Sequence, residues 1–295
     1  MADFITTAFV NDYKTTVQFL LQQMGSRFRA AVTEDSYKGQ QGKSVEQFGS
    51  ATAQKRTSRN SDTPNIDLQQ DARWVFPNDY EWGKIVDDQD KLRMIIDPTS
   101  PIAQAAAFAM QRGQDDEIIN AFFAQSFTGQ FGTTTENFDT TNYKVANTVG
   151  GASSGMNVAK LQAAMKALIK ANKGELREPA YCAISSEEHD ALLKETQVSN
   201  KDFNGGAAVL EDGRVKRFMG FEFIITERLL TDSTGTYRLC PAWLKSGMHL
   251  GIWEDIVAKI AERTDKSFST QVYTRMTIGA TRLMQGKVIQ LECTI

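Results

Sequence analysis

Residues 65–77 read NIDLQQDARWVFP, and they alternate apolar and polar side chains as a half-buried β-strand does. One side of this strand carries large apolar residues and the other carries polar ones; the apolar set is Ile66, Leu68, Ala72, Trp74 and Phe76, and the polar set is Asp67, Gln69, Asp71 and Arg73. The strand lies within a polar stretch, residues 37–97, that lacks the apolar residues for a core of its own. We therefore expect another copy of the chain to cover the apolar side, which favours an assembling shell over a self-contained enzyme.

The residues around this strand predict a long, charged hairpin. Residues 37–60 are strongly basic with the single acid Glu46, whereas residues 62–90 are predominantly acidic. A connection of this length is unusual in a compact domain, and its aromatic residues argue against disorder. Two strands of about 11 residues would reach roughly 35 Å, far enough to lie across a neighbour. The residues that we predict to make intersubunit contacts are Ile66, Leu68, Trp74 and Phe76 on the apolar side and Lys55, Arg56 and Arg59 in the basic cluster.

The basic cluster of Lys55, Arg56 and Arg59 has three interpretations. It is a solvated hairpin tip, a partner for an acidic patch on a neighbouring subunit, or a phosphate contact. The phosphate contact ranks third. The chain has a net charge of -3 and a pI near 5.6, which argues against a protein whose main function is to bind nucleic acid.

Composition describes a globular chain with no membrane segment. The 295 residues are 41% hydrophobic, enough for a substantial core in one large or two ordinary domains. No apolar run approaches the ~20 residues that a membrane span requires, and the N-terminus does not resemble a signal peptide. Cys182, Cys240 and Cys293 are odd in number and far apart, without CxxC spacing, so the sequence indicates neither a disulfide framework nor a zinc site, and we expect a reducing compartment.

The periodicity predicts an α+β fold with a mainly antiparallel sheet. Amphipathic spacing predicts a surface helix over residues 12–31, a helix over 100–124 that begins at Ser100 and Pro101 and has small residues in its middle, and a helix capped by Asn157. Ser185 and Glu188 match a capping box for a further helix. Alternating residues predict strands near 181–184, 219–225, 272–280 and 289–295, and residues 125–155 look like a loop region.

Residues suited to catalysis or metal binding are few. Cys182 and His189 are a formal nucleophile and base, but one falls in a predicted strand and the other in a helix, and a buried structural cysteine is the commoner case. His249 stands alone. The acidic runs Asp87, Asp88, Asp90 and Asp115, Asp116, Glu117 are explained at least as well by a solvated surface as by a cation site or a general acid/base pair. We therefore predict no catalytic, cofactor or metal site.

Taken in order, these elements resemble the major capsid protein of tailed double-stranded DNA bacteriophages, which has the Hong Kong 97-type fold. Four stretches carry the resemblance: DPTSPIAQAAAFAMQRGQDDEIINAFF (97–123), PAYCAISSEEHDALL (179–193), DGRVKRFMGFEFIITERLL (212–230) and AERTDKSFSTQVYTRMTIGATRLMQGKVIQL (261–291). The first is similar to the segment leading into and forming the family's long spine helix, the next two to segments of its axial domain, and the last to its closing strands.

The resemblance implies a domain plan and a set of partners. Residues 1–40 would be an N-terminal arm, 41–97 the extended loop (E-loop), 98–135 with 236–295 the peripheral domain, and 136–235 the axial domain. The chain would self-assemble as pentamers and hexamers into an icosahedral virion head, in the host bacterial cytoplasm, around double-stranded DNA that it contacts non-specifically. A scaffolding protein, a portal protein and a decoration protein are the implied partners. The short N-terminus leads us to expect a separate scaffolding protein, and we predict no Lys–Asn cross-link of the kind that some relatives have.

Two other functions fit parts of the sequence. A bacterial nanocompartment shell shares this fold and would enclose a cargo enzyme. The alternative from another class is a hydrolase that uses Cys182 or Ser185 as its nucleophile.

Overall fold

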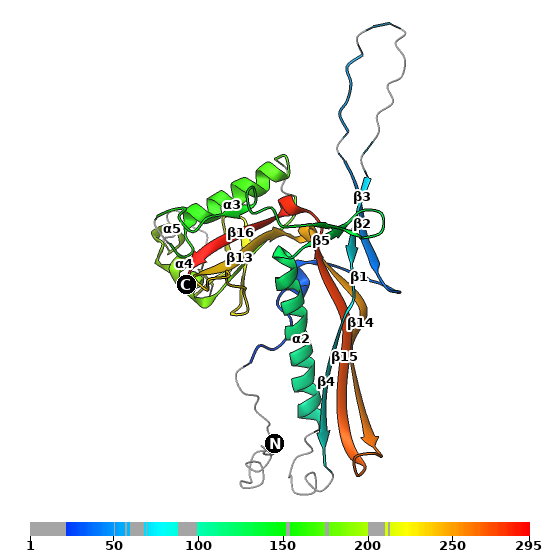
Figure 1. The fold of residues 1–295 in the computed structure, drawn as a ribbon. Coiled ribbons are helices and arrows are strands. Elements are labelled where there is room, and N and C mark those ends of the chain that lie inside the picture. The colour runs from blue at the N-terminus through cyan, green and yellow to red at the C-terminus, as the bar shows by residue number, and fades with distance from the viewer. Residues whose placement is uncertain are drawn as a thin grey trace.

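The computed structural model describes residues 22–49, 51–56, 58–59, 68, 70–87, 99–151, 154–174, 177–199, 210–211 and 213–295. These residues form an α+β fold built around two main sheets, with a small sheet at the base of a projecting loop (Figure 1). The helices are α2 (Thr99–Phe123), α3 (Val158–Ala171), α4 (Ser186–Lys194) and α5 (Thr196–Ser199), and the 3₁₀ turns are η2 (Arg29–Ala31), η4 (Lys245–Gly247) and η5 (Gln285–Lys287).

The first main sheet is long and four-stranded, and α2 lies along it (Figure 1). Its order is β1 (Thr33–Ser36), β14 (Met248–Arg263), β15 (Ser269–Arg282) and β4 (Asn78–Val86), with β1 parallel to β14 and the other pairs antiparallel. The predicted small middle of the helix is used for close packing. A Cβ at Gly113 would lie 3.1 Å from Cε of Met276, so a larger residue there would require the Met276 side chain to shift.

The second main sheet is six-stranded and lies beside α3 and α4 (Figure 1). Its order is β11 (Arg217–Phe218), β12 (Phe221–Ile225), β8 (Ala180–Ile184), β13 (Tyr237–Leu244), β16 (Val288–Thr294) and β7 (Lys144–Val145). One face packs under α3 through its buried residues Leu161, Ala164 and Leu168. The opposite face presents Trp243, which the aromatic rings of the N-terminal segment and of α2 cover.

The local signals for helix starts are confirmed. The Asn157 side chain accepts a hydrogen bond from the Lys160 N–H at 2.8 Å at the start of α3, and Ser185 and Glu188 form the expected capping box of α4. The predicted strands are present as β8, β12, β15 and β16. β12 begins at Phe221, two residues later than expected, because Met219 has φ +51° and Gly220 φ +82° in the turn that joins β11 to β12.

The N-terminal segment differs from the predicted surface helix. Residues 12–21 of that helix lie outside the described residues; of the rest, only η2 is helical, and it is a single 3₁₀ turn. Phe28 and Ala31 are almost fully buried in the main core, so this segment is not a surface arm at that point. Its apolar residues recur at helical spacing, but burial in the core decides their conformation.

The sheets also divide the chain differently from the expected domain plan. β4 falls in the range 41–97 expected to be loop, yet it pairs with β15 over its whole length. β13 and β16 fall in the range 236–295 expected in the peripheral domain, yet they pair in the six-stranded sheet, β13 lying next to β8. Among the described helices, none has the length and apolar content to cross a membrane.

Candidate functional site

The predicted hairpin is present and has a sheet at its root. β2 (Gly42–Phe48) runs antiparallel to β3 (Gln70–Val75), with Gly42 opposite Val75 and Phe48 opposite Gln70. β3 also pairs with β5 (Ser126–Thr128), which pairs with β6 (Thr134–Glu136). Residues 51–56 and 58–59 therefore lie on a segment that projects from a four-stranded base, away from the two main sheets (Figure 1).

Trp74 and Phe76 lie against the chain's own β5–β6 hairpin. The Trp74 Nε1–H donates to the Gly129 carbonyl at 2.7 Å, and the ring lies so close to Gly132 (φ +66°) that a Cβ there would be 2.9 Å from Cγ. The Phe76 ring meets Phe127 edge to face, with 4.8 Å between centroids. The chain itself therefore covers part of these two side chains, which are half-buried, whereas we expected only a neighbouring copy to cover them. Residues 126–136, expected to be loop, form the hairpin that covers them.

Arg73 was expected on the solvent side of β3 and is instead buried. Its Nε–H donates to the Leu283 carbonyl at 2.9 Å, and Nη1 forms an ion pair with Glu136. Both sides of β3 are therefore covered at its base, which fixes the direction in which the loop leaves the body.

The remaining predicted contact residues are exposed where they are described. Leu68 has 44% of its surface exposed, and Lys55, Arg56 and Arg59 are all exposed. Arg56 also donates from Nε to the Ser58 carbonyl at 3.0 Å, a bond within the loop tip. Ile66 lies outside the described residues. Six of the seven predicted residues are thus placed: Trp74 and Phe76 lie in the packed root, Leu68 is exposed just before β3, and the three cations are exposed at the tip.

The acidic run on α2 is a structural junction and not the solvated surface favoured by its composition. Asp115 is fully buried and accepts hydrogen bonds from Gln23 Nε2 at 2.5 Å, Ser26 Oγ at 2.6 Å, Arg27 N at 3.0 Å and Phe28 N at 3.2 Å. A carboxylate that takes this many donors, two of them backbone N–H groups, holds the N-terminal segment against α2.

The next two acids join other elements to the same helix. Asp116 pairs with Arg228, and Glu117 accepts from the Tyr80 hydroxyl at 2.6 Å and from Asn78 Nδ2 at 2.7 Å. Burial and the Glu117 carboxylate raise the pKa of Tyr80, so its hydroxyl stays a donor. Three consecutive acids of α2 thus hold three segments that are distant in sequence.

The residues considered for hydrolysis do not form a nucleophile and base. Cys182 is fully buried in β8, and burial raises the pKa of its thiol, which keeps it protonated. Ser185 is fully buried as the cap of α4, and His189 Nε2 accepts from the Val215 N–H at 3.2 Å. His249 links β14 to the N-terminal segment through Thr33 Oγ1 at 3.1 Å and the Tyr37 hydroxyl at 2.8 Å. These side chains therefore hold the fold together.

Comparison with solved structures places the whole fold among phage capsids. The capsid of cyanophage P-SCSP1u is similar over 100% of this chain and 95% of its own, with a TM-score of 0.73 and 13% identity. The capsid of Helicobacter pylori bacteriophage KHP30 is similar over 100% of this chain and 99% of its own, with a TM-score of 0.71 and 11% identity. The capsid of cyanophage Pam1 is similar over 100% of this chain and 99% of its own, with a TM-score of 0.70 and 13% identity. The α+β architecture is therefore the Hong Kong 97-type capsid fold.

The sequence itself shows the family. No curated protein is significantly similar to this chain in sequence. The family described as phage capsid protein, however, matches residues 5–295, which is nearly the full length. The chain therefore belongs to the phage capsid protein family and is a structural subunit of a phage capsid.

Proposed function

We propose that this chain is the major capsid protein, which self-assembles as pentamers and hexamers into the icosahedral head that encloses phage double-stranded DNA. The observation that carries the proposal is the loop beyond β2 and β3, which projects from the body and carries an exposed leucine and three exposed cations (Figure 1). Within a single copy of the chain, these loop residues contact solvent. In a shell, a neighbouring copy supplies a surface on which they can pack.

The root and the tip of the loop have different roles in this proposal. Trp74 and Arg73 are held by Gly129 and Leu283 of the same chain, so the root sets the direction of the loop before assembly. Leu68 and the three cations of the tip then contact an adjacent subunit. Burial of apolar area contributes roughly 25 cal/mol per Å², less the cost of ordering the loop. Each contact is modest, but a closed shell repeats it in every subunit.

We assign the domains on the basis of the two main sheets. We assign the long sheet with α2 to the peripheral domain and the six-stranded sheet with α3 and α4 to the axial domain clustered at capsomer centres. The extended loop then consists of β2, β3 and the residues between them, and the N-terminal arm ends before the buried Phe28, where Asp115 holds Ser26 and Arg27.

The proposed partners are those of a phage head. A scaffolding protein during assembly, a portal protein and a decoration protein would contact the shell, and assembly would take place in the host bacterial cytoplasm. Contact with DNA would be non-specific and weak, in keeping with the net charge of -3. The family match supports a phage head over a nanocompartment, and the buried Cys182 gives a hydrolase no support.

Reversing the charge of the loop tip tests the proposal. The combined substitutions Lys55→Glu, Arg56→Glu and Arg59→Glu should leave the thermal stability of the unassembled chain nearly unchanged, because all three side chains are exposed. Shell yield should fall strongly, since each exposed ion pair is worth about 0.2–1 kcal/mol and the loss recurs in every subunit. Electron microscopy and sedimentation measure the yield.

A matched control separates this contact from a general charge effect. Lys166→Glu, Lys170→Glu and Lys173→Glu make the same change in charge at exposed positions in and just after α3. These variants should assemble normally. Normal shells from the loop-tip variant would show that the tip is not an intersubunit contact. Trp74→Asp is a poorer test, because it would also disrupt the packing of the loop root.

A further inference from the structure

The three cysteines of the chain form a diagonal row across three neighbouring strands. Cys182 of β8 pairs with Ala242 of β13, and Cys240 of β13 pairs with Leu291 of β16. Cys240 is two residues before Ala242, and Cys293 is two residues after Leu291, so each cysteine is displaced by two positions from the last. Side chains two residues apart share a face of a sheet, so all three thiols lie on the same face. Spacing along the chain gave no sign of this grouping, because the order of the strands creates it.

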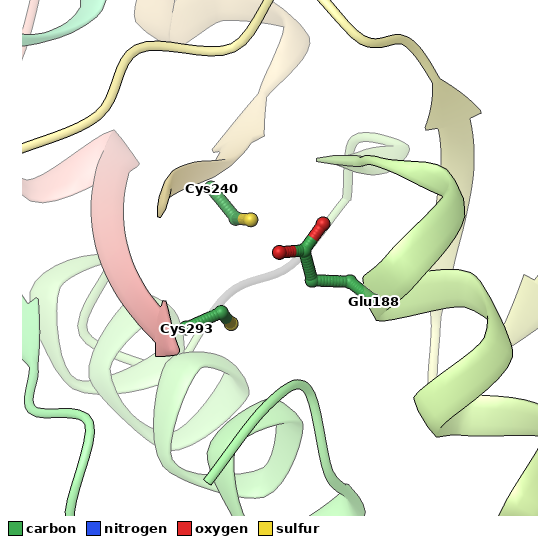
Figure 2. Close-up of side chains that lie close together, drawn as sticks. All are labelled: Glu188, Cys240 and Cys293. Carbon is green, nitrogen blue, oxygen red and sulfur yellow. The ribbon is translucent and has the colours of Figure 1, made fainter. Parts of the chain in front are cut away.

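Two of these thiols meet a buried carboxylate. The Sγ atoms of Cys240 and Cys293 and a carboxylate oxygen of Glu188 all lie within 4.8 Å of one another. Figure 2 shows the three side chains converging from β13, β16 and α4. Both cysteines are fully buried, and Glu188 has 1% of its surface exposed.

One oxygen of Glu188 has no hydrogen-bond partner. Oε2 accepts from the Ser185 backbone N–H at 2.8 Å, as the capping box of α4 requires, and it also accepts from the Ser185 hydroxyl. Oε1 is buried without a hydrogen bond. A buried carboxylate oxygen without a hydrogen-bond partner lowers the stability of the fold. An electropositive ligand at this position would satisfy it.

We propose that Cys240, Cys293 and Glu188 bind one Zn²⁺ ion in the axial domain. Thiolate and carboxylate are donors that zinc takes in proteins, and thiolates select for it over the harder Mg²⁺ and Ca²⁺. Zn–S bonds of about 2.3 Å in tetrahedral geometry place donors roughly 3.5–4 Å apart, so these atoms need to draw in by about 1 Å or less. With three protein ligands the fourth position belongs to a water molecule.

The surrounding charges balance the proposed ion. On binding, the two thiols release their protons to solvent, and the resulting two thiolates and one carboxylate exceed the charge of Zn²⁺ by one negative unit. Lys160 offsets this excess, and Arg238 lies nearby but also faces the carboxylates of Glu187 and Glu227. The ammonium of Lys160 donates to the carbonyls of Gly155 at 2.9 Å and Glu292 at 2.8 Å, and Nη1 of Arg238 lies 3.7 Å from Oε2 of Glu188.

A disulfide between the two thiols is the weaker interpretation of this geometry. Cys240 and Cys293 are diagonal neighbours on antiparallel strands, and such residues have Cα atoms about 7–8 Å apart. Disulfides span about 4.4–6.8 Å between Cα atoms, whereas a metal ion bridges the longer separation.

Metal content tests the site directly. The full chain would be purified under reducing conditions after expression with added zinc sulfate, dialysed into metal-free buffer and analysed by plasma mass spectrometry. About one Zn²⁺ per chain is expected. Titration of the metal-depleted chain with Co²⁺ should give a thiolate-to-cobalt charge-transfer band, which a surface ion would not produce.

Variants assign the ligands. Cys293→Ser and Glu188→Gln are close in size to the native residues and should weaken Zn²⁺ affinity by at least about 100-fold, more than the loss of an outer hydrogen-bond partner commonly costs. Cys182→Ser is the matched control, because Cys182 is equally buried in the same row but not among the three close donors. It should keep the ion.

Three results would overturn the proposal. The first is a wild-type chain that holds no zinc and gives no charge-transfer band. The second is a Cys293→Ser variant that binds as tightly as the wild type. The third is a Cys240–Cys293 disulfide found by mass spectrometry in protein purified without oxidant. The zinc content of the wild-type chain tests the proposal even if a variant fails to fold. None of these results depends on shell assembly.

Discussion

Replacement of Arg282 by alanine should lower the free energy of unfolding by about 3–5 kcal/mol, one of the two largest effects that we expect. Arg282 is almost fully buried, and its Nη1 donates to the carbonyls of Phe122 at 2.7 Å and Ala124 at 3.0 Å, at the end of α2. Its guanidinium lies 5.1 Å from the centre of the Phe138 ring. Alanine would leave both carbonyls without this donor and would open a cavity between β15 and α2.

Arg282→Met is the matched variant. Burial lowers the pKa of Arg282 to about 10, so the native fold bears a cost for keeping this charge out of water. Methionine fills much of the same volume and removes that cost, and replacing a buried ion by an apolar residue of similar size is often well tolerated. The methionine variant should therefore be clearly more stable than the alanine variant in urea unfolding of the unassembled chain. Equal stability of the two variants would show that filling the volume of the Arg282 side chain contributes little, since both variants lose its hydrogen bonds.

Phe28→Ala should also cost about 3–5 kcal/mol, the range for removing a buried aromatic ring. The Phe28 ring stacks on Trp243 with 5.8 Å between centroids and lies 6.3 Å from Phe122, so it joins the six-stranded sheet to α2. Trp243 Nε1–H in turn donates to the Ala31 carbonyl at 2.9 Å. Loss of the ring would therefore loosen the N-terminal segment as well as the core.

Phe28→Leu is the control for that substitution. Leucine keeps an apolar side chain in the same position and should cost less than about 1.5 kcal/mol. Denaturant unfolding followed by tryptophan fluorescence reports on the change, because Trp243 lies against the ring. If alanine and leucine had the same small effect, Phe28 would not be a core residue.

Signals that act over a few residues were enough to predict much of the fold. Asn157, Ser185 and Glu188 cap their helices as expected, because capping depends on neighbours three residues away. The small residues of α2 and the alternation in β15 and β16 were also informative, since burial on one face leaves a periodic pattern. The order of the elements then indicated the family.

Features that depend on distant partners could not be predicted. Arg73, Asp115 and Arg282 are charged residues that sequence alone would place in water, and each is buried because backbone groups far along the chain meet it. The cover over Trp74 comes from residues 126–136, whose Gly- and Thr-rich composition is typical of a loop. The cysteine row exists only once β8, β13 and β16 are side by side.

Electron cryomicroscopy of the particles formed by the purified chain tests the central proposal, assembly through the projecting loop, most directly. The account predicts closed icosahedral shells in which Leu68 and residues 51–59 of one subunit lie on the surface of the adjacent subunit, while Trp74 stays packed on Gly132 of its own chain. Particles in which residues 51–59 lie on the body of their own subunit, or a chain that remains a monomer under all assembly conditions, would contradict it.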